Sequence, residues 1–234
     1  MLCSYGKREC LTIMAIGLLV AGSLAVAGLW WPIFPTALVS LCLLAFFRDP
    51  ERRIPTERNA MVSPADGKVT SVHQLDHYAP LGGPATCIRI FLSVLDVHVN
   101  RAPCHSRVES VHFQPGGHLN ALKAASAKKN ESNLLILCHP NRPERVAAVR
   151  QVAGLLARTI VCVAREGQIF QRGQRFGMIK LGSTTELYLP ENCEPKPVVQ
   201  PGQHVRAGQS IVAYVTGNPI QPTAVPADTG PEKT

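Results

Sequence analysis

The chain has 234 residues, which is enough for one ordinary globular domain with an appendage and too few for two full-sized enzyme domains. Hydrophobic residues make up 46% of it and charged residues 17%, which excludes a disordered chain. Eight cysteines without a C-x-x-C pair exclude a small disulfide scaffold, a zinc ribbon and a thioredoxin-like motif. The net charge of +8 favours an anionic partner such as an acidic membrane surface, whereas aromatic residues at 6%, with no basic run interleaved among them, disfavour nucleic acid.

The N-terminal part of the chain predicts a membrane anchor. Residues 11–47 include no Asp, Glu, Lys or Arg. Leu11–Trp31 is long enough for a helix that spans a bilayer, and Pro32 and Pro35 are expected to interrupt that helix. The second apolar arm, Thr36–Phe47, is too short to cross as a straight helix. The pattern therefore favours a membrane-embedded helical hairpin over residues 1–47.

The residues around these arms predict their orientation. The basic residues that flank the apolar stretch are Lys7, Arg8, Arg48, Arg52 and Arg53. If both flanks follow the positive-inside bias, both lie in the cytoplasm, so we expect the inner cell membrane with the soluble domain on its cytoplasmic side. Trp30 and Trp31 are expected near the turn or an interface. A single span that places the soluble part outside and a signal peptide cleaved after Ala25–Ala27 are the alternatives.

The remainder of the chain predicts a β domain. Pro50 and Pro55 prevent a helix from continuing, so the domain boundary follows Phe47. Short segments rich in β-branched residues then alternate with turn formers. These segments are Lys68–Val72, Ala85–Leu92, Arg107–Phe113, Leu134–Leu137, Arg145–Val152, Thr159–Ala164, Gly177–Lys180 and Glu186–Leu189. The pattern indicates a mostly β fold, a compact antiparallel sandwich or open barrel, in which Asn120–Lys129 is the one good helix candidate.

Two similar segments refine this expectation. Residues 169–176 and 205–211 each contain a short turn with glycine between two strand starts, which indicates two hairpin turns. Such segments recur in the flattened β-sandwich of biotin and lipoyl carriers, so the expected fold resembles a biotin/lipoyl-like hybrid. The expected division is an anchor at 1–47, a linker at 48–60, the β domain at 61–215 and a flexible tail at 216–234.

Three places bring reactive side chains into apolar strand context, and each alone has an ordinary structural explanation. Asp66-Gly67 is a common turn signal. A lone histidine among apolar residues, such as His98, is usually a satisfied core or surface group. A Gly-Ser pair between strands, such as Gly182-Ser183, is nearly always a turn.

Four motifs together resemble the short, membrane-anchored class of phosphatidylserine decarboxylases. The motifs are Phe46-Phe47-Arg48-Asp49-Pro50-Glu51-Arg52, Ser63-Pro64-Ala65-Asp66-Gly67, Asp96-Val97-His98-Val99-Asn100-Arg101 and Leu181-Gly182-Ser183-Thr184. Each is weak alone, but they occur in the family's order behind a membrane segment and run from residue 46 to 190.

The resemblance implies an enzyme that cuts its own chain between Gly182 and Ser183, giving a large subunit (1–182) and a small one (183–234). The Ser183 hydroxyl would attack the Gly182 carbonyl, and elimination followed by hydrolysis would convert Ser183 to a pyruvoyl group. The substrate amine would form a Schiff base at this group, with no metal and no pyridoxal phosphate. His98 would be the base and proton donor, and Asp66 would orient it.

The resemblance leaves other roles open. Arg101 or Lys68 could hold the lipid phosphate, on charge and proximity in sequence alone. The long class has a second histidine where Arg101 stands, so His98 serves both self-cleavage and decarboxylation or shares them with another histidine. The candidates for that second histidine are His105, His112, His118 and His139.

The implied activity is decarboxylation of phosphatidylserine to phosphatidylethanolamine and carbon dioxide at a membrane, with the two subunits of one precursor as partners and a homodimer as a further possibility. A non-catalytic, membrane-tethered β-sandwich carrier or adaptor is one alternative. A membrane-bound serine hydrolase using Ser183, His98 and Asp66 is another, although no G-x-S-x-G motif surrounds Ser183.

Overall fold

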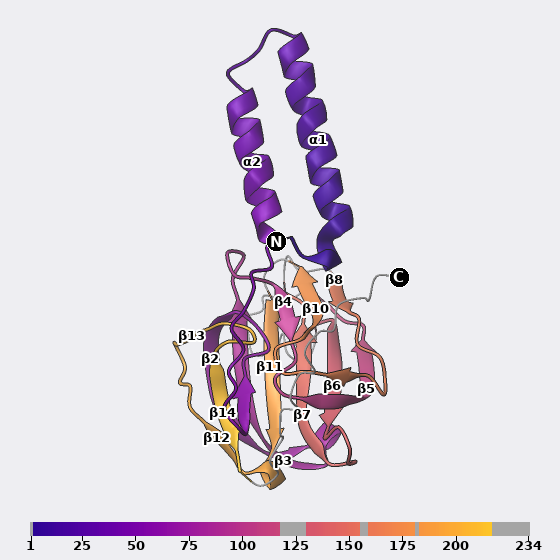
Figure 1. The fold of residues 1–234 in the computed structure, drawn as a ribbon, viewed down its shortest axis with the longest axis vertical. Coiled ribbons are helices and arrows are strands. Elements are labelled where there is room, and N and C mark those ends of the chain that lie inside the picture. The colour runs from indigo at the N-terminus through magenta and orange to yellow at the C-terminus, as the bar shows by residue number, and fades with distance from the viewer. Residues whose placement is uncertain (1, 118–129, 155–158, 181–182, 217–234) are drawn as a thin grey trace, which may run out of the picture.

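A helical hairpin stands on one end of a β domain in the computed structural model, which describes residues 2–117, 130–154, 159–180 and 183–216 (Figure 1). A 3-10 turn, η1 (Ser4–Gly6), leads into α1 (Lys7–Val26), and α2 (Ile33–Phe46) returns the chain to the domain. Pro35 lies in the first turn of α2, where a proline needs no helical N–H partner. The expectation that Pro35 interrupts the helical segment is therefore wrong, and residues 27–32 form the only break in it among the described residues.

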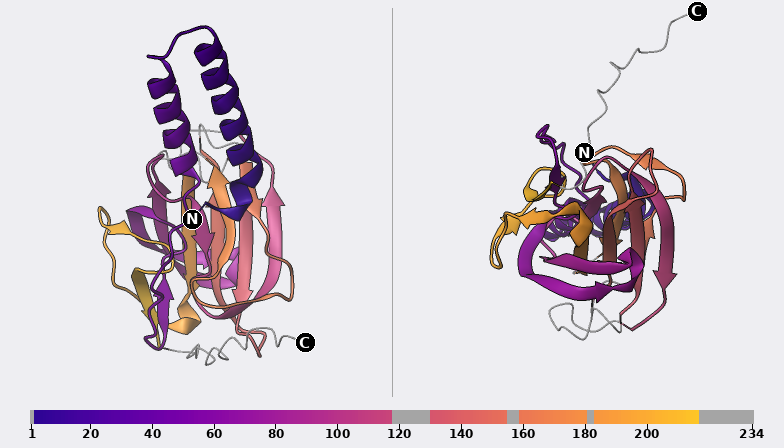
Figure 2. Two further views of the ribbon diagram at one scale, coloured as in Figure 1. Left: turned by 45° about the horizontal axis from the view of Figure 1, so that its top comes forward. Right: turned by 90° about the horizontal axis from the view of Figure 1, so that it is seen from below.

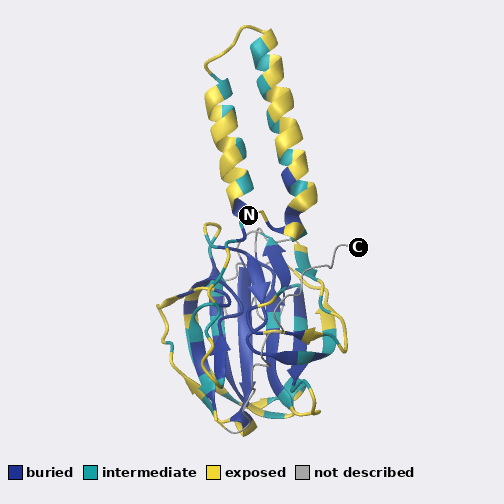
Figure 3. Cartoon of the chain, viewed as in Figure 1, coloured by how far each residue is buried: buried dark blue, intermediate teal, exposed yellow. Residues whose placement is uncertain are grey.

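Most of the hairpin is exposed (Figure 3), and beyond its charged foot the exposed side chains are mainly apolar. Leu18 and Phe34 are 74% exposed, and Trp31 at the tip is 79% exposed. Residues 4–26 form a helix that is long and apolar enough to cross a membrane, whereas α2 has only 14 residues. This surface fits a lipid environment better than water.

The β domain is built on one large curled sheet of eight strands (Figure 2). Its strands in order across the sheet are β13 (His204–Val205), β2 (Gly67–Tyr78), β3 (Gly83–Leu92), β11 (Ser183–Pro190), β7 (Arg145–Val152), β6 (Ser132–Cys138), β5 (Ser106–Gln114) and β9 (Ile169–Phe170). Neighbouring strands run antiparallel. The ladder of β2 with β3 shifts register twice and that of β5 with β6 once, and such bulges bend the sheet.

Two small sheets complete the domain. One contains β1 (Ala60–Val62), β14 (Ile211–Val215) and β12 (Pro195–Pro197), and the other contains β4 (Val99–Arg101), β10 (Arg175–Lys180) and β8 (Thr159–Cys162). The turns η2 (Ala79–Leu81) and η3 (Glu191–Cys193) connect strands. The main core draws fully buried side chains from all three sheets and the loops between them, including Met61, Ile90, Leu187, Phe176 and Val212.

The mostly β fold expected from the sequence is confirmed, and each predicted strand coincides with an observed one. The list of predicted strands lacks β14 (Ile211–Val215), of which only the start was indicated, and the strands of two or three residues, which are too short to show a periodic pattern. The predicted helix Asn120–Lys129 lies outside the described residues. Asp66-Gly67 does not close a hairpin as its dipeptide suggests, because β1 pairs with β14 and β2 pairs with β3. It instead carries the chain from one sheet to another.

Candidate active site

The predicted reactive serine lies at the end of the β domain that faces the hairpin. β10 ends at Lys180, and β11 begins at Ser183, which pairs with Leu92 of β3. Gly182, predicted to supply the cleaved carbonyl, lies outside the described residues. Ser183 is fully buried, and its Oγ has no hydrogen-bond partner among the residues that the structure describes. A buried hydroxyl without a partner is rare in folded proteins and marks Ser183 as a group available for chemistry.

His98 is positioned at the same end of the domain. The chain leaves β3 at Leu92, turns through residues 93–96 and reaches His98 just before β4. The N–H of Ile179 in β10 donates to the His98 carbonyl (3.2 Å), which ties the histidine to the strand that precedes Ser183. The imidazole is fully buried, and its ring centre lies 4.4 Å from that of Phe46 in α2.

Burial controls the protonation of His98. It lowers the pKa of the imidazole to about 4, because a charged ring in this buried position would lack the water that stabilises it in solution. This effect outweighs the hydrogen bond to Asp96, which raises the pKa. Nδ1 lies 2.9 Å from the Asp96 carbonyl oxygen. A carbonyl only accepts, so in the neutral ring Nδ1 carries the proton and Nε2 carries the lone pair. His98 is therefore arranged as a base near neutral pH.

Asp96 was not among the predicted site residues, and it is the residue whose backbone carbonyl orients the His98 ring. Its backbone carbonyl receives Nδ1–H, while its carboxylate fixes the turn by accepting hydrogen bonds from the N–H (2.8 Å) and hydroxyl (2.7 Å) of Ser93. The exposed ring of His204 lies 3.3 Å from the other carboxylate oxygen. A backbone carbonyl acts here as a carboxylate does in a Ser-His-Asp triad.

Asp66, predicted to orient His98, has other partners. Its carboxylate pairs with Arg52 (2.7 Å) and accepts the N–H of Ala207 (2.8 Å). Burial raises the pKa of this carboxyl despite those two hydrogen bonds. Its contacts join the linker, the start of β2 and the turn before β14, which gives Asp66 a structural position beside the site.

The two candidates for phosphate binding occupy different environments. Arg101 is buried, and its guanidinium donates to Asp49 (2.7 Å) and to the carbonyl oxygens of Gly173 (3.0 Å) and Pro50 (3.2 Å). These contacts hold the linker on the domain and occupy both terminal nitrogens of the Arg101 guanidinium. Lys68 is exposed on β2, at the same end of the large sheet as Ser183.

A buried network of hydrogen bonds among three side-chain amides and one hydroxyl lies beside the site. The Asn100 amide donates to the Thr185 hydroxyl (3.1 Å), two residues after Ser183, and Gln151 donates to the Asn100 oxygen (2.9 Å). Asn133 in turn donates to Gln151 (3.1 Å). The four side chains are at most 3% exposed and connect β4 of a small sheet to β11, β7 and β6 of the large one. No local sequence pattern indicates this network, because its members lie on four different strands and Gln151 follows the charged Arg150.

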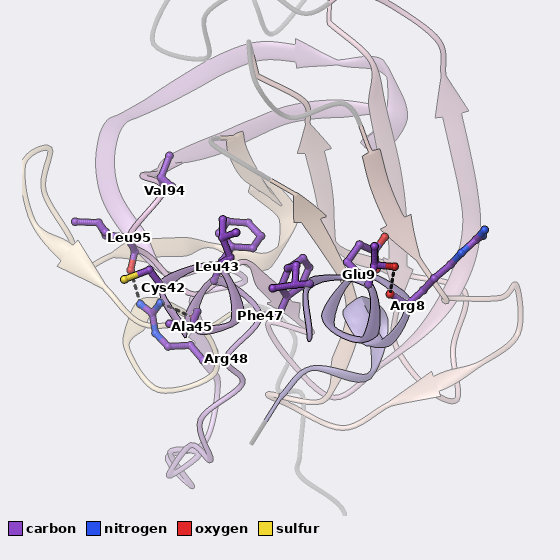
Figure 4. Close-up of a pocket in the computed structure, with 12 residues that line it drawn as sticks. Arg8, Glu9, Cys42, Leu43, Ala45, Phe47, Arg48, Val94 and Leu95 are labelled. Atoms are coloured by element: carbon purple, nitrogen blue, oxygen red, sulfur yellow. Dashed lines mark hydrogen bonds between the residues drawn. The ribbon is translucent and has the colours of Figure 1, made fainter. Parts of the chain in front are cut away.

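An apolar groove of about 820 Å³ lies where the hairpin meets the β domain (Figure 4). Arg8 and Glu9 of α1 lie on one side of it, and Arg48 and Leu95 on the other. Arg48 donates to the carbonyl oxygens of Ala45 (3.1 Å) and Leu95. Phe46 lines the groove and also contacts the His98 ring, so the groove reaches the side of the base.

No cluster of three or more His, Cys, Asp or Glu residues suited to a metal ion occurs in the described part of the chain. The groups gathered at this end of the domain are a buried hydroxyl, a neutral imidazole and an apolar groove with arginines at its edge. They can carry out proton transfer and nucleophilic attack beside an apolar ligand.

Comparison with known proteins identifies the family. The model of the family described as phosphatidylserine decarboxylase matches residues 39–213. A phosphatidylserine decarboxylase proenzyme from Rhodopirellula baltica is 43% identical over 210 residues, covering 89% of this chain and 85% of the relative. Proteins with the same description from Chlorobium phaeobacteroides (40% over 219 residues, 92% and 100% covered) and Cupriavidus pinatubonensis (39% over 199 residues, 85% and 88% covered) are also similar. The chain therefore belongs to the phosphatidylserine decarboxylase family of carboxy-lyases.

Proposed function

We propose that this protein converts phosphatidylserine to phosphatidylethanolamine and carbon dioxide after cutting its own chain between Gly182 and Ser183. The observation that carries the proposal is the buried hydroxyl of Ser183 at the first position of β11, which has no hydrogen-bond partner within the described part of the chain. The relatives are described as proenzymes, which agrees with a precursor that matures by cleavage.

Ser183 performs the first step. Its Oγ attacks the Gly182 carbonyl carbon, the C–N bond breaks and the acyl group moves to oxygen. His98 takes the hydroxyl proton on Nε2, which a neutral imidazole can do at pH 7. Loss of the Cα proton of residue 183 then expels the Gly182 carboxylate, and water replaces the nitrogen of the resulting dehydroalanine, which leaves as ammonia. A pyruvoyl ketone remains at residue 183.

That ketone would supply an electron-withdrawing carbonyl for the electrons released when the carboxylate of the substrate departs as carbon dioxide. Ser183 is the residue that holds it, in a strand flanked by β3 and β7. His98 would take a proton on Nε2 from the ammonium group of the substrate and return it to the carbon that lost the carboxylate, while the Asp96 carbonyl holds Nδ1–H throughout. Phe46 keeps water from one face of that ring.

The groove at the foot of the hairpin provides the approach for a lipid. Its apolar lining suits acyl chains, and Arg8 and Arg48 place positive charge at its edge for a phosphate group. The hairpin would sit in the inner cell membrane with the β domain on the cytoplasmic side. The basic residues Lys7 and Arg8 are the first two of α1, and Arg48 follows α2, so both ends of the hairpin carry positive charge. The substrate then never leaves the bilayer.

Mass measurement on the purified chain tests the proposal. We expect two fragments, 1–182 and 183–234, and an N-terminus on the smaller fragment that resists Edman degradation but reacts with a hydrazide. Vesicles with phosphatidylserine should release carbon dioxide in its presence. An intact chain that a serine-directed phosphonate labels would instead indicate a hydrolase, and an intact, unlabelled and inactive chain would indicate an adaptor.

A further inference from the structure

We propose that Glu9 of the membrane hairpin positions the cleavage junction. Glu9 lies in the first turn of α1 and forms an ion pair with Lys180, the last residue of β10. The inference rests on the proposed self-cleavage and adds that the hairpin is part of the processing apparatus as well as a tether.

The pair connects the anchor to the strand that leads into the junction. Lys180 stands three positions before Ser183, and its side chain is only 16% exposed. The end of β10 is fixed on one side by β8, where Lys180 pairs with Thr159. On the hairpin side, the Glu9 carboxylate holds the Lys180 ammonium, and the positive N-terminal end of α1 favours a carboxylate at that position.

The same strand also holds the backbone of His98, the proposed base. Ile179 donates its N–H to the His98 carbonyl, and Met178 pairs with Val99, the next residue after His98. A displacement of the end of β10 would therefore move His98 and the residues before Ser183 together. Displacements on the order of 1 Å can cost 10²-fold in rate when a nucleophile must meet a carbonyl.

The end of the hairpin next to the β domain is closely packed against it, so Glu9 is held in a fixed position relative to Lys180. The N–H of Cys3 donates to the Phe47 carbonyl (2.7 Å), and a Cβ at Gly6 would lie 2.1 Å from the Phe47 ring. Cys10, Phe46 and Met178 belong to one apolar cluster that joins both helices to β10. The ends of α1 and α2 contact β10 only when the hairpin is folded. The ion pair of Glu9 with Lys180 therefore forms, and fixes the end of β10, only when the hairpin is packed on the domain.

The magnitude of an ion pair separates a positioning role from a structural one. Glu9 is 39% exposed, and pairs of that kind contribute about 0–1 kcal/mol to folding. Removing the charge should therefore leave the thermal stability of the chain nearly unchanged. Its effect should fall on the rate of cleavage.

The test measures precursor conversion in full-length chains synthesised in the presence of vesicles of phosphatidylcholine and phosphatidylglycerol. Glu9→Gln and Lys180→Met should each slow conversion about tenfold or more. The reversed pair, Glu9→Lys with Lys180→Glu, should restore much of the rate, which a general loss of packing would not. Glu109→Gln is the matched control, because Glu109 of β5 pairs with Arg145 at the end of β7 far from the junction, and it should process normally.

The results distinguish a failure of the proposed function from a failure of this inference alone. If the unmodified chain is not cleaved, the proposed function fails and this inference falls with it. If the unmodified chain is cleaved and the Glu9 and Lys180 variants keep pace with it, only the inference is overturned. It is also overturned if the reversed pair is no faster than the single variants, or if Glu9→Gln lowers the melting temperature of the uncleaved Ser183→Ala chain more than Glu109→Gln does.

Discussion

Ser183 is held in a state that folding alone does not favour. An unpaired buried hydroxyl costs about 1–3 kcal/mol relative to one that is hydrogen-bonded. Ser106, another fully buried serine, donates to the Cys104 carbonyl, whereas Ser183 has no such acceptor among the described residues. The difference is expected if the Ser183 oxygen must approach a carbonyl carbon rather than satisfy a backbone group.

Ser183→Ala should leave the chain whole and without decarboxylase activity, because it removes the attacking oxygen. The fold should persist and gain stability, since the substitution removes a buried hydroxyl that has no partner among the described residues. Gel electrophoresis and intact mass measure the processing. Ser106→Ala should be cleaved as the unmodified chain is, and normal turnover by Ser183→Ala would show that another group does the chemistry.

His98 should make folding stability depend on pH. Its folded-state pKa of about 4 lies below its ordinary value of 6.5, so the unfolded chain binds the extra proton between these pH values. Stability is therefore greatest above pH 6.5 and falls by about 3 kcal/mol as the pH drops to 4. Asp96 and Arg48, the charged residues that also act on this ring, do not reverse the shift.

Urea unfolding of the Ser183→Ala chain at a series of pH values measures this loss. His98→Gln in the same background should lose less stability over that window than the parent. The raised pKa of Asp66 is common to both chains and cancels in the comparison. Parallel curves for His98→Gln and the parent would contradict a neutral, buried His98.

Ser183 and His98 could be proposed as site residues because local motifs contain them, whereas no motif indicated the hydrogen-bond partner of His98. Asp96 acts through its backbone carbonyl, which every residue possesses, so no side-chain pattern announces it. Asp66 binds the N–H of Ala207, 141 residues away in the chain. Only the folded topology brings such positions together.

At the scale of elements, the two turn segments that resemble each other in sequence belong to a repeated unit. β13 pairs with β2 and β14 with β1, and in the same way β9 pairs with β5 and β10 with β4. Gly208 and Gly173 take positive φ values of 72° and 76° in the two turns. Their N–H groups donate to Ser63 and Ala102 at 2.8 Å. The sequence signalled the turns, while the pairing of their distant strands required the structure.

Arg101 should matter for stability more than for substrate affinity. Its buried partner Asp49 also forms an ion pair with Arg175, with 2.5 Å between Nε and the carboxylate oxygen. Removal of one member of a buried ion pair costs about 3–5 kcal/mol. Arg101→Met should therefore lower the free energy of unfolding by about that amount, measured by urea denaturation of the uncleaved chain. Lys68→Met, at an exposed site, should leave it unchanged.

Kinetics separate the two roles of these residues. If Arg101 grips the phosphate, the folded Arg101→Met enzyme should show a raised KM with normal stability, which would contradict the structural role. A raised KM in Lys68→Met alone would instead assign the headgroup contact to Lys68.

At the scale of the whole molecule, the length of the hairpin limits how it can enter a bilayer. α1 has 20 residues and α2 has 14, which correspond to about 30 Å and 21 Å of helix, against a hydrocarbon core of about 30 Å. Both helices begin or end at the β domain, so the shorter one sets the depth. The tip should then lie in the far half of the bilayer rather than in water beyond it.

Trp30 and Trp31 are the two tryptophans of the chain, and both lie at this tip, so intrinsic fluorescence reports its depth without a label. In vesicles with the β domain outside, we expect a blue-shifted emission, weak quenching by external iodide and strong quenching by lipids brominated deep in the acyl chains. Trp30→Phe and Trp31→Phe assign the signal to each residue, and both should behave alike. Ready quenching by iodide, with none by brominated lipids, would place the hairpin on the membrane surface and remove the basis for a catalytic domain held against the bilayer by two buried helices.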